Sequence, residues 1–298
     1  MTPLQLRCVL AVADGLHFTR AAAALGIAQS ALSHQVAALE EELGAPLFER
    51  TSRRVRLTPA GEALLPRARS VLAELDRLRT DVVAASGAVE GRLRIGTIPT
   101  LPDLRLHEVL LALRRAHPGI RASVTVHSSE ITLAQVAAGT LDAGLAGFPL
   151  DAPPRGVEAE VLATEPHVAV LGPDHPLRAR RRVRLRDVAA CPFVDFPAGT
   201  GGRRQTDEAF AAARLARDVV VETDDLRLLL DLVRSGAGVA LLPAAAVRGG
   251  EAGDGVRTVV VTDGPVRRSC VLHAGATSSA ATRAFLAELR RHLAAPAG

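Results

Sequence analysis

Residues 18–56 constrain the fold of this chain more than any other stretch. In their middle, residues 28–44 read AQSALSHQVAALEEELG. Apolar residues recur there at spacings of four, three and four, at Leu32, Val36, Leu39 and Leu43. This period predicts a helix with one apolar face. Hydrogen-bonding residues fall on the other face of its first two turns, at Gln29, Ser30, Ser33 and His34.

The polar face of this predicted helix suits DNA. Small uncharged hydrogen-bonding side chains read base edges and phosphates in a major groove. The second half of the helix carries Glu40, Glu41 and Glu42, which phosphate would repel. Only the N-terminal half can therefore meet DNA, as in a recognition helix.

A shorter helix precedes it in the sequence. We predict this helix over Arg20–Leu25, with Thr19 as its N-cap and a turn at Gly26. Helix, glycine turn and helix together predict a helix-turn-helix. Spacing alone leaves a second interpretation open, an ordinary helical hairpin whose polar face is solvated.

The region resembles the helix-turn-helix of LysR-type transcriptional regulators. The resemblance is ungapped and covers residues 18–22 (FTRAA), 25–36 (LGIAQSALSHQV), 39–44 (LEEELG), 47–50 (LFER) and 57–61 (LTPAG). Two positions depart from the family pattern: Ala28 stands where Ser or Thr commonly caps the recognition helix, and His17 replaces a small hydroxyl residue. The family implies a regulator that binds double-stranded DNA at an interrupted inverted repeat near a promoter.

A basic hairpin is expected after the recognition helix. Residues 47–58 alternate loosely and predict two short strands with a tip at Thr51–Arg54. Arginines on such a wing fit phosphates or a narrow minor groove, although an exposed basic loop is the plainer alternative. We assign DNA contact to Thr19, Gln29, Ser30, Ser33, His34, Arg50, Arg53 and Arg54.

The next segment carries an apolar seam. Thr58 and Pro59 are typical of a helix start, and Pro66 is expected to kink the first turns. Spacings of four and three then alternate along Leu64, Ala68, Val71, Leu75, Leu78, Val82 and Ala85. Such a heptad seam needs a partner helix, most simply from a second copy of the chain. We expect a homodimer or homotetramer formed through Leu64, Val71, Leu75, Leu78 and Val82.

From Arg92 onward, predicted strands alternate with predicted helices, which indicates mostly parallel, doubly wound sheets in two α/β lobes. Residues 157–170 are interpreted as two strands. The region resembles the effector-binding part of LysR-type regulators, which has a periplasmic-binding-protein-like fold. The resemblance rests on residues 93–96 (LRIG), 141–142 (LD), 199–203 (GTGGR), 236–238 (GAG) and 242–243 (LP).

The expected fold is therefore α/β with an N-terminal winged helix-turn-helix and a linker helix. The predicted domain bounds are residues 1–58 for DNA binding, 59–87 for the linker and 88–298 for effector binding. Within the last domain, residues 92–162 and 266–298 form lobe I, and residues 163–265 form lobe II.

A ligand site is expected where strands end and helices begin, because helix N-termini offer free N–H groups. Thr100 follows a strand and is expected to open a helix at Pro102. The same position in other strand–helix units is held by Ser128, Ser129, Phe196 and Thr200. These five residues form our predicted site for a small, anionic effector. The alternative is that the hydroxyl residues only cap helices.

Composition narrows the remaining functions. All 36 basic residues are Arg, which excludes a P-loop lysine and a Schiff-base lysine. The three cysteines make no disulfide framework or metal box, and Cys191 lacks a resolving cysteine nearby for a redox role. We expect no cofactor, no signal peptide, no membrane contact and a cytoplasmic location.

The sequence opposes two other function classes. A small-molecule transport protein is opposed by the N-terminal DNA-binding unit, and an enzyme by the lack of catalytic motifs. The six arginines in residues 178–186 are interpreted as a solvated connector, with RNA polymerase or DNA as a further candidate partner.

Overall fold

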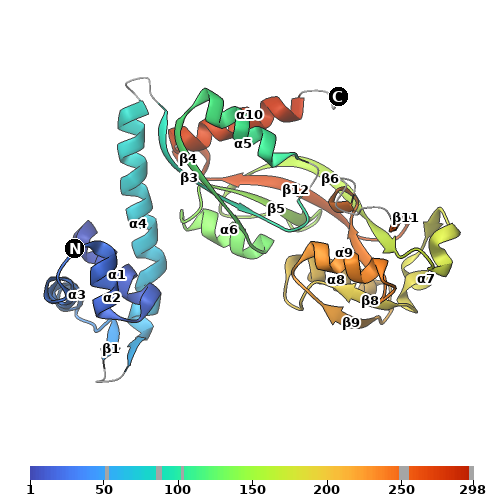
Figure 1. Cartoon of the computed structure of the whole chain (residues 1–298), viewed down its shortest axis with the longest axis horizontal. Coiled ribbons are helices and arrows are strands. Elements are labelled where there is room, and N and C mark those ends of the chain that lie inside the picture. Colours follow the sequence, from blue (N-terminus) through green and yellow to red (C-terminus); the bar gives the residue numbers. More distant parts are fainter. Residues whose placement is uncertain (51–53, 85–88, 102–103, 248–254, 295–298) are drawn as a thin grey trace. The chain divides into compact units, whose positions relative to one another are not determined.

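The computed structural model describes residues 1–50, 54–84, 89–101, 104–247 and 255–294 (Figure 1). The chain divides into two compact units. One contains residues 1–86 and 138–140, and the other contains residues 87–137 and 141–298. Each unit is described by itself.

The first unit is a winged helix-turn-helix followed by a long helix. Its elements are α1 (Pro3–Gly15), α2 (Phe18–Leu25), α3 (Gln29–Leu43), β1 (Phe48–Arg50), β2 (Val55–Leu57) and α4 (Pro59–Ala84). The strands β1 and β2 pair antiparallel, with Phe48 opposite Leu57. The predicted apolar face of α3 is buried at Leu32, Val36 and Leu39. The buried face, but not the helix, ends one turn earlier than expected, because Leu43 is 42% exposed.

The start of α2 differs from the prediction. Thr19 is not the N-cap: it lies inside the helix, and its side chain is exposed. The cap is His17, whose Nδ1 accepts a hydrogen bond from the Arg20 N–H at 3.4 Å. An imidazole nitrogen can satisfy a free N–H at a helix start, as a hydroxyl does. The turn between α2 and α3 contains Gly26 at φ +68°, a backbone conformation that favours glycine.

Glu40 has a structural role that the sequence did not suggest. Its carboxylate accepts hydrogen bonds from the backbone N–H groups of Leu47 and Phe48, at 2.7 and 3.1 Å. Glu40 therefore fixes the start of the hairpin against α3, so its charge does not serve only to keep phosphate from the second half of that helix.

The long helix α4 begins as predicted. The Thr58 hydroxyl accepts from the N–H of Gly61 at 3.0 Å and donates to the carbonyl of Pro46 at 2.7 Å. The helix continues through Pro66. Its first part belongs to the core of the unit: Ala68 is buried, and Leu64 packs partly buried against the same core. Leu64 thus contributes to the domain's own packing, and its place in the seam between copies stays a prediction.

Further along α4, the apolar seam is exposed within the single chain. Val71, Leu75, Leu78 and Val82 are 47%, 37%, 61% and 67% exposed. Ala85 and the predicted hinge at residues 86–88 lie outside the described residues.

The second unit is built on strands that run through both lobes. One sheet has the order β4-β3-β5-β12-β6-β11-β7, with β10 also paired to β6 and a separate pair formed by β8 and β9. The strands are β3 (Glu90–Thr97), β4 (Gly119–Val126), β5 (Ala143–Pro149), β6 (Glu158–Leu171), β7 (Arg182–Val183), β8 (Pro192–Asp195), β9 (Asp218–Glu222), β10 (Ala240–Pro243), β11 (Arg257–Val261) and β12 (Val266–His273).

The prediction of two strands in residues 157–170 is wrong, since β6 is a single strand of 14 residues. Its first part pairs with β12 from Glu158 to Pro166, and its second part pairs with β10 and β11 from His167 onward. One continuous strand thus serves both lobes. These pairings are antiparallel, whereas β3 pairs parallel with β4 and β5, and β8 pairs parallel with β9. The sheets are therefore less uniformly parallel than predicted.

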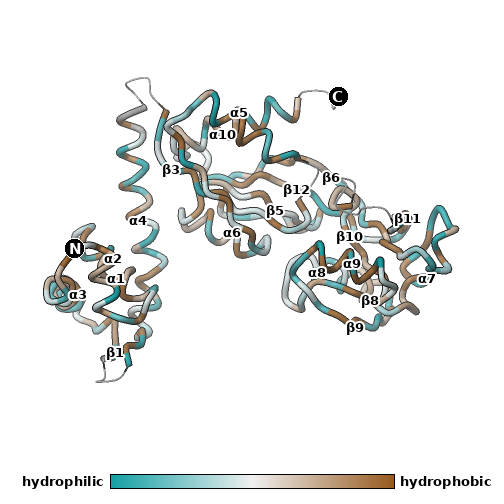
Figure 2. The backbone as a smooth tube through the Cα atoms, viewed as in Figure 1, coloured by the Kyte–Doolittle hydropathy of each residue, from teal (hydrophilic) through white to brown (hydrophobic). Residues whose placement is uncertain are grey.

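Helices cover these strands in each lobe. Helices α5 (Leu106–Ala116) and α10 (Ala280–Ala294) pack on the core of the first lobe, and α6 (Ser129–Ala137) lies beside β5. The second lobe contains α7 (Leu185–Ala189), α8 (Gly201–Ala212) and α9 (Leu226–Arg234). Figure 2 shows hydrophobic residues concentrated in the strands of both lobes, with mixed hydropathy along the helices. No helix in the described part of the chain is long and apolar enough to span a membrane.

Candidate functional site

The polar face of α3 is open to solvent. Gln29, Ser30 and His34 are exposed, and Ser33 is half-buried. The Gln29 amide donates a hydrogen bond to the Ser33 hydroxyl at 2.9 Å, which links the two residues across one helical turn. Ala28 precedes the helix without a side-chain cap, so free N–H groups remain at its start. The residues predicted to read DNA are therefore presented together on one surface.

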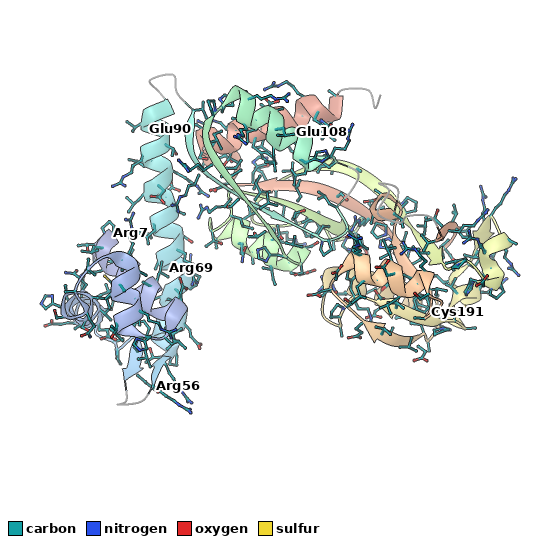
Figure 3. All side chains as sticks on the ribbon, viewed as in Figure 1. Arg7, Arg56, Arg69, Glu90, Glu108 and Cys191 are labelled. Atoms are coloured by element: carbon teal, nitrogen blue, oxygen red, sulfur yellow. The ribbon has the colours of Figure 1, made fainter. Side chains whose placement is uncertain are left out.

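The wing carries basic residues beside this helix. Arg54 and Arg56 are exposed, and Figure 3 shows Arg56 extending away from the hairpin. Arg50 ends β1, but its side chain is not described, and Arg53 lies outside the described residues. The hairpin itself is present where the sequence predicted it.

A cavity of about 270 Å³ lies between the two lobes of the second unit. Residues from both lobes line it, and all five residues predicted for the ligand site are among them: Thr100, Ser128 and Ser129 from the first lobe, and Phe196 and Thr200 from the second. The apolar part of the wall comes from Ile98, Val126, Ile131 and Phe196.

The prediction that Thr100 opens a helix is wrong. Helix α5 begins at Leu106, with Arg105 as an N-cap that makes no side-chain capping bond, so Thr100 does not open this helix. The Thr100 hydroxyl instead accepts a hydrogen bond from Nη1 of Arg267 at 2.8 Å. The Thr100 carbonyl also accepts from the Arg267 guanidinium. Thr100 is 6% exposed. Its bond to Arg267, a residue far away in the sequence, holds it at the cavity wall.

Arg267 is a buried cation at the cavity wall, 3% exposed. Its guanidinium pairs with the carboxylate of Glu165 at 3.0 Å. That carboxylate also accepts from the Ser269 hydroxyl at 3.0 Å and from the Ala245 N–H at 2.9 Å. Burial lowers the pKa of Arg267, while the nearby charge of Glu165 raises it. Neighbouring His167 is 1% exposed, and burial lowers its pKa to about 4.

Three hydroxyls of the first lobe keep their protons available to a ligand. Ser128 accepts from the N–H of Ile131 at 3.3 Å, and Ser129 accepts from the N–H of Gly147 at 3.1 Å. Thr100 accepts from Arg267, as described. A hydroxyl that accepts a bond still has one O–H to donate. The hydroxyls of Thr100, Ser128 and Ser129 can therefore donate to oxygen atoms of a ligand, and α6 starts beside them at Ser129.

The second lobe contributes a different wall. Thr200 precedes α8, and its hydroxyl donates to the carbonyl of Pro197 at 2.8 Å rather than capping the helix. Gln205 is 6% exposed and lines the cavity, and its Oε1 has no hydrogen-bond partner among the described residues. Exposed Asp224 also borders the cavity and adds one negative charge to this side.

An ion pair joins the lobes beside the cavity. Arg204 of α8 pairs with Glu130 of α6. The Glu130 carboxylate also lies against the start of α8, where a side chain on Gly201 would come within 2.5 Å of its Oε1. A side chain at position 201 would therefore have to displace the Glu130 carboxylate. The positive end of α8 already faces a carboxylate of the protein.

The three cysteines lie away from this cavity. Cys8 and Cys270 are buried, and Cys191 is half-buried in the second lobe, at the position marked in Figure 3. All three are free thiols, and burial raises the pKa of each of them. None is among the residues that line the cavity.

Two family models cover nearly all of the chain. The model for bacterial regulatory helix-turn-helix proteins of the lysR family matches residues 4–62, and the LysR substrate binding domain matches residues 86–294. The chain belongs to the LysR family of transcriptional regulators. It is thus a DNA-binding regulator with a two-lobed effector-binding domain.

Individual relatives agree with this assignment. A probable hydrogen peroxide-inducible genes activator of Mycobacterium avium is 37% identical over 243 residues, covering 81% of this chain and 78% of the relative. The uncharacterized HTH-type transcriptional regulator YnfL of Escherichia coli K12 is 35% identical over 243 residues, covering 80% of this chain and 81% of the relative.

Solved structures of full-length LysR regulators are also similar. A full-length OxyR variant from Pseudomonas aeruginosa has a TM-score of 0.72 and 26% identity, over 98% of this chain and 94% of that chain. CbnR in complex with its target DNA has a TM-score of 0.69 and 25% identity, over 98% of this chain and 100% of that chain.

Among the cavity residues of this LysR-type regulator that sequence reasoning missed are Arg267 and Gln205. Arg267 lies in a run with Arg268 on β12, and nothing in that run marks one arginine as buried. Gln205 follows the GTGGRR segment, whose glycines and helix start are the stronger sequence signals. A signal existed in its position, since residue 205 is one helical turn beyond Gly201 and so shares the cavity-facing side of α8.

Proposed function

We propose that this LysR-type regulator senses a small organic anion in the cavity between its lobes and changes transcription from a nearby promoter. The observation that carries the proposal is the group of hydroxyl donors, Thr100, Ser128 and Ser129, beside the start of α6 and the buried cation Arg267. Hydroxyl protons and helix N–H groups both favour negatively charged oxygen. The five predicted residues, with Phe196 and Thr200, form the proposed effector site.

The charges around the cavity support a position for the anionic group on the first lobe. The start of α8 already faces Glu130, and Asp224 adds a second carboxylate on that side. A ligand carboxylate would be repelled there. Glu130 belongs to the first lobe, but its carboxylate lies at the start of α8 and pairs with Arg204, so it is already neutralised by a partner. The apolar body of the effector would then contact Ile98, Val126 and Phe196.

The proposed DNA target is an interrupted inverted repeat, read by Gln29, Ser30, Ser33 and His34, with the wing arginines on phosphate. We propose further that two copies join through the exposed part of α4, and that such dimers can pair as tetramers. RNA polymerase is the proposed downstream partner, and the cytoplasm, where promoter DNA lies, is the proposed location.

A thermal-shift screen of small carboxylic acids against the full-length protein tests the effector proposal. Acids that raise the melting temperature are then titrated by calorimetry into wild type, Thr100→Val and Thr100→Ser. Removing one hydroxyl donor from a buried ligand oxygen costs about 1–3 kcal/mol, so affinity for Thr100→Val should fall roughly tenfold or more. Thr100→Ser keeps the hydroxyl and should bind nearly as wild type does. Equal affinity of all three proteins would remove Thr100 from the site.

A response to hydrogen peroxide is the alternative that the names of several relatives suggest. Peroxide reacts with thiolate, and exposed, low-pKa cysteines are the sensors. The thiols of this chain have raised pKa values, and none lines the cavity. We therefore favour a reversibly bound acid. Exposure to peroxide should leave operator binding unchanged in wild type and in Cys191→Ser. If peroxide changes operator binding in wild type and Cys191→Ser abolishes that change, the alternative is favoured.

A further inference from the structure

Gln205 differs from the other polar residues of the cavity. The hydroxyls of Thr100, Ser128, Ser129 and Thr200 each take part in one bond within the protein. Gln205 is 6% exposed, and its Oε1 makes no hydrogen bond to any described residue. Its Oε1 is therefore a buried acceptor without a partner among the described residues, in a side chain that lines the cavity.

The helix fixes Gln205 in this position. The hydroxyl of the next residue, Thr206, lies 3.2 Å from Oδ2 of Asp195 and accepts from Arg217 at 2.9 Å. Arg217 in turn pairs with Asp195, and both side chains are almost completely buried. This network holds the second turn of α8, and with it the backbone of Gln205, to the lobe core.

An amide left without partners in a buried site is unfavourable for folding. Burying a polar group costs free energy unless it is hydrogen-bonded, and an apolar side chain of similar size would be more favourable at such a position. A ligand that bonds to the amide removes that cost only while it is bound. Such a group therefore discriminates between ligands that can bond to it and ligands that cannot.

We propose that Gln205 selects effectors with a second polar group, a hydroxyl or an amide, at the end opposite the acid. The inference rests on the proposed function, since it assumes the acid on the hydroxyls of the first lobe. The two polar walls are then joined by the apolar residues Ile98, Val126 and Phe196. The carboxamide of Gln205 can both donate and accept hydrogen bonds, so it can pair with a ligand hydroxyl, which can also do both. The effector class is a small hydroxy acid or acid amide with an apolar middle.

Two matched pairs of probes test the selectivity: hexanoate against 6-hydroxyhexanoate, and 3-phenylpropanoate against 3-(4-hydroxyphenyl)propanoate. Each is titrated by calorimetry into full-length wild type and Gln205→Leu. In at least one pair, wild type should bind the hydroxy acid roughly tenfold more tightly than the plain acid. Gln205→Leu should lose this preference and bind the plain acid as well as wild type or better.

Melting temperatures without ligand give an independent measurement. Replacing an unpartnered buried amide by an apolar group should raise the melting temperature by about 2–4 °C. The adjacent substitution Thr206→Val is the control, because that hydroxyl is bonded and its loss should lower the melting temperature. A clear decrease for Gln205→Leu would show that its amide has partners in the protein, which would overturn the inference.

The binding outcomes separate the two proposals. If wild type binds the plain acids but gains nothing from the hydroxyl in either pair, selection by Gln205 is wrong and the anionic effector stands. If wild type binds none of the four acids, the anionic effector itself is wrong and the inference fails with it.

Discussion

The guanidinium of Arg267 and the carboxylate of Glu165 form an ion pair 3.0 Å long in which both side chains are 3% exposed. The two residues stand directly opposite each other on β12 and β6. Glu165 lies just before the point where β6 leaves its pairing with β12 and continues into the second lobe. The pair therefore fixes the strand that joins the lobes, and it also supplies the cation beside Thr100.

Breaking this pair should destabilise the protein strongly. Arg267→Leu leaves the Glu165 carboxylate buried without its countercharge, which costs about 3–5 kcal/mol. The double variant Arg267→Leu, Glu165→Leu removes both charges and should recover much of that loss. Urea denaturation followed by circular dichroism measures the effect.

An exposed ion pair is the control for this measurement. Arg290 pairs with Glu160, and the two side chains are 59% and 34% exposed. Arg290→Leu should change stability by less than about 1 kcal/mol, because solvent screens such pairs. A loss for Arg267→Leu as small as the loss for Arg290→Leu would show that the buried charge is not an important part of the fold.

His167 predicts a dependence of stability on pH. Burial lowers its pKa from 6.5 to about 4 in the folded protein, so the folded state holds it neutral. Its contribution is fully present above pH 6.5 and is lost as pH falls toward 4, because the unfolded chain takes up the proton first. A shift of this size corresponds to about 3 kcal/mol at most. Denaturation between pH 7 and pH 4.5 should show a steeper loss for wild type than for His167→Gln, and parallel curves would contradict the prediction.

Local patterns predicted the first unit well, because its elements depend on neighbouring residues. Helix period predicted the buried face of α3, and Thr58 followed by Pro59 predicted the start of α4. The prediction failed at Thr19 because His17, an unusual cap, begins α2 two residues earlier. The packing of Leu64 on the domain's own core was not predicted, because a seam in the sequence does not tell which part of it that core covers.

The five residues predicted for the ligand site all line one cavity, but Thr100 does not open a helix as predicted. Thr100 lines the cavity through a bond to Arg267, which is 167 residues away in sequence, and no local signal reports such a contact. The sequence also did not predict that β6 is one continuous strand, because each half is stabilised by a different partner strand. Gln205 could be recognised only once its burial and its unpartnered amide were known.

The exposed part of α4 predicts how copies associate. Leu78 is 61% exposed in the single chain, and a negative charge placed there would be buried across a two-fold axis if α4 is the interface. Leu78→Glu should therefore weaken association and operator binding together. Thr80→Glu adds the same charge on the other side of the helix and should leave both unchanged. Sedimentation of Leu78→Glu with the same mass as wild type would show that α4 is not the interface.

The open face of α3 predicts how sequence recognition separates from general DNA affinity. Gln29 is exposed and positioned by its bond to Ser33, so it can meet a base edge, whereas Arg54 on the wing can meet only phosphate or the minor groove. Gln29→Ala should cost about 1–3 kcal/mol on the operator and almost nothing on unrelated DNA. Arg54→Ala should weaken binding to both DNAs alike and reduce the salt dependence of the binding constant by about one phosphate contact. Fluorescence anisotropy with the promoter fragment upstream of the regulator's own gene and a scrambled fragment, at several salt concentrations, measures both effects. Unchanged operator affinity in Gln29→Ala would mean that another face of the unit docks on DNA.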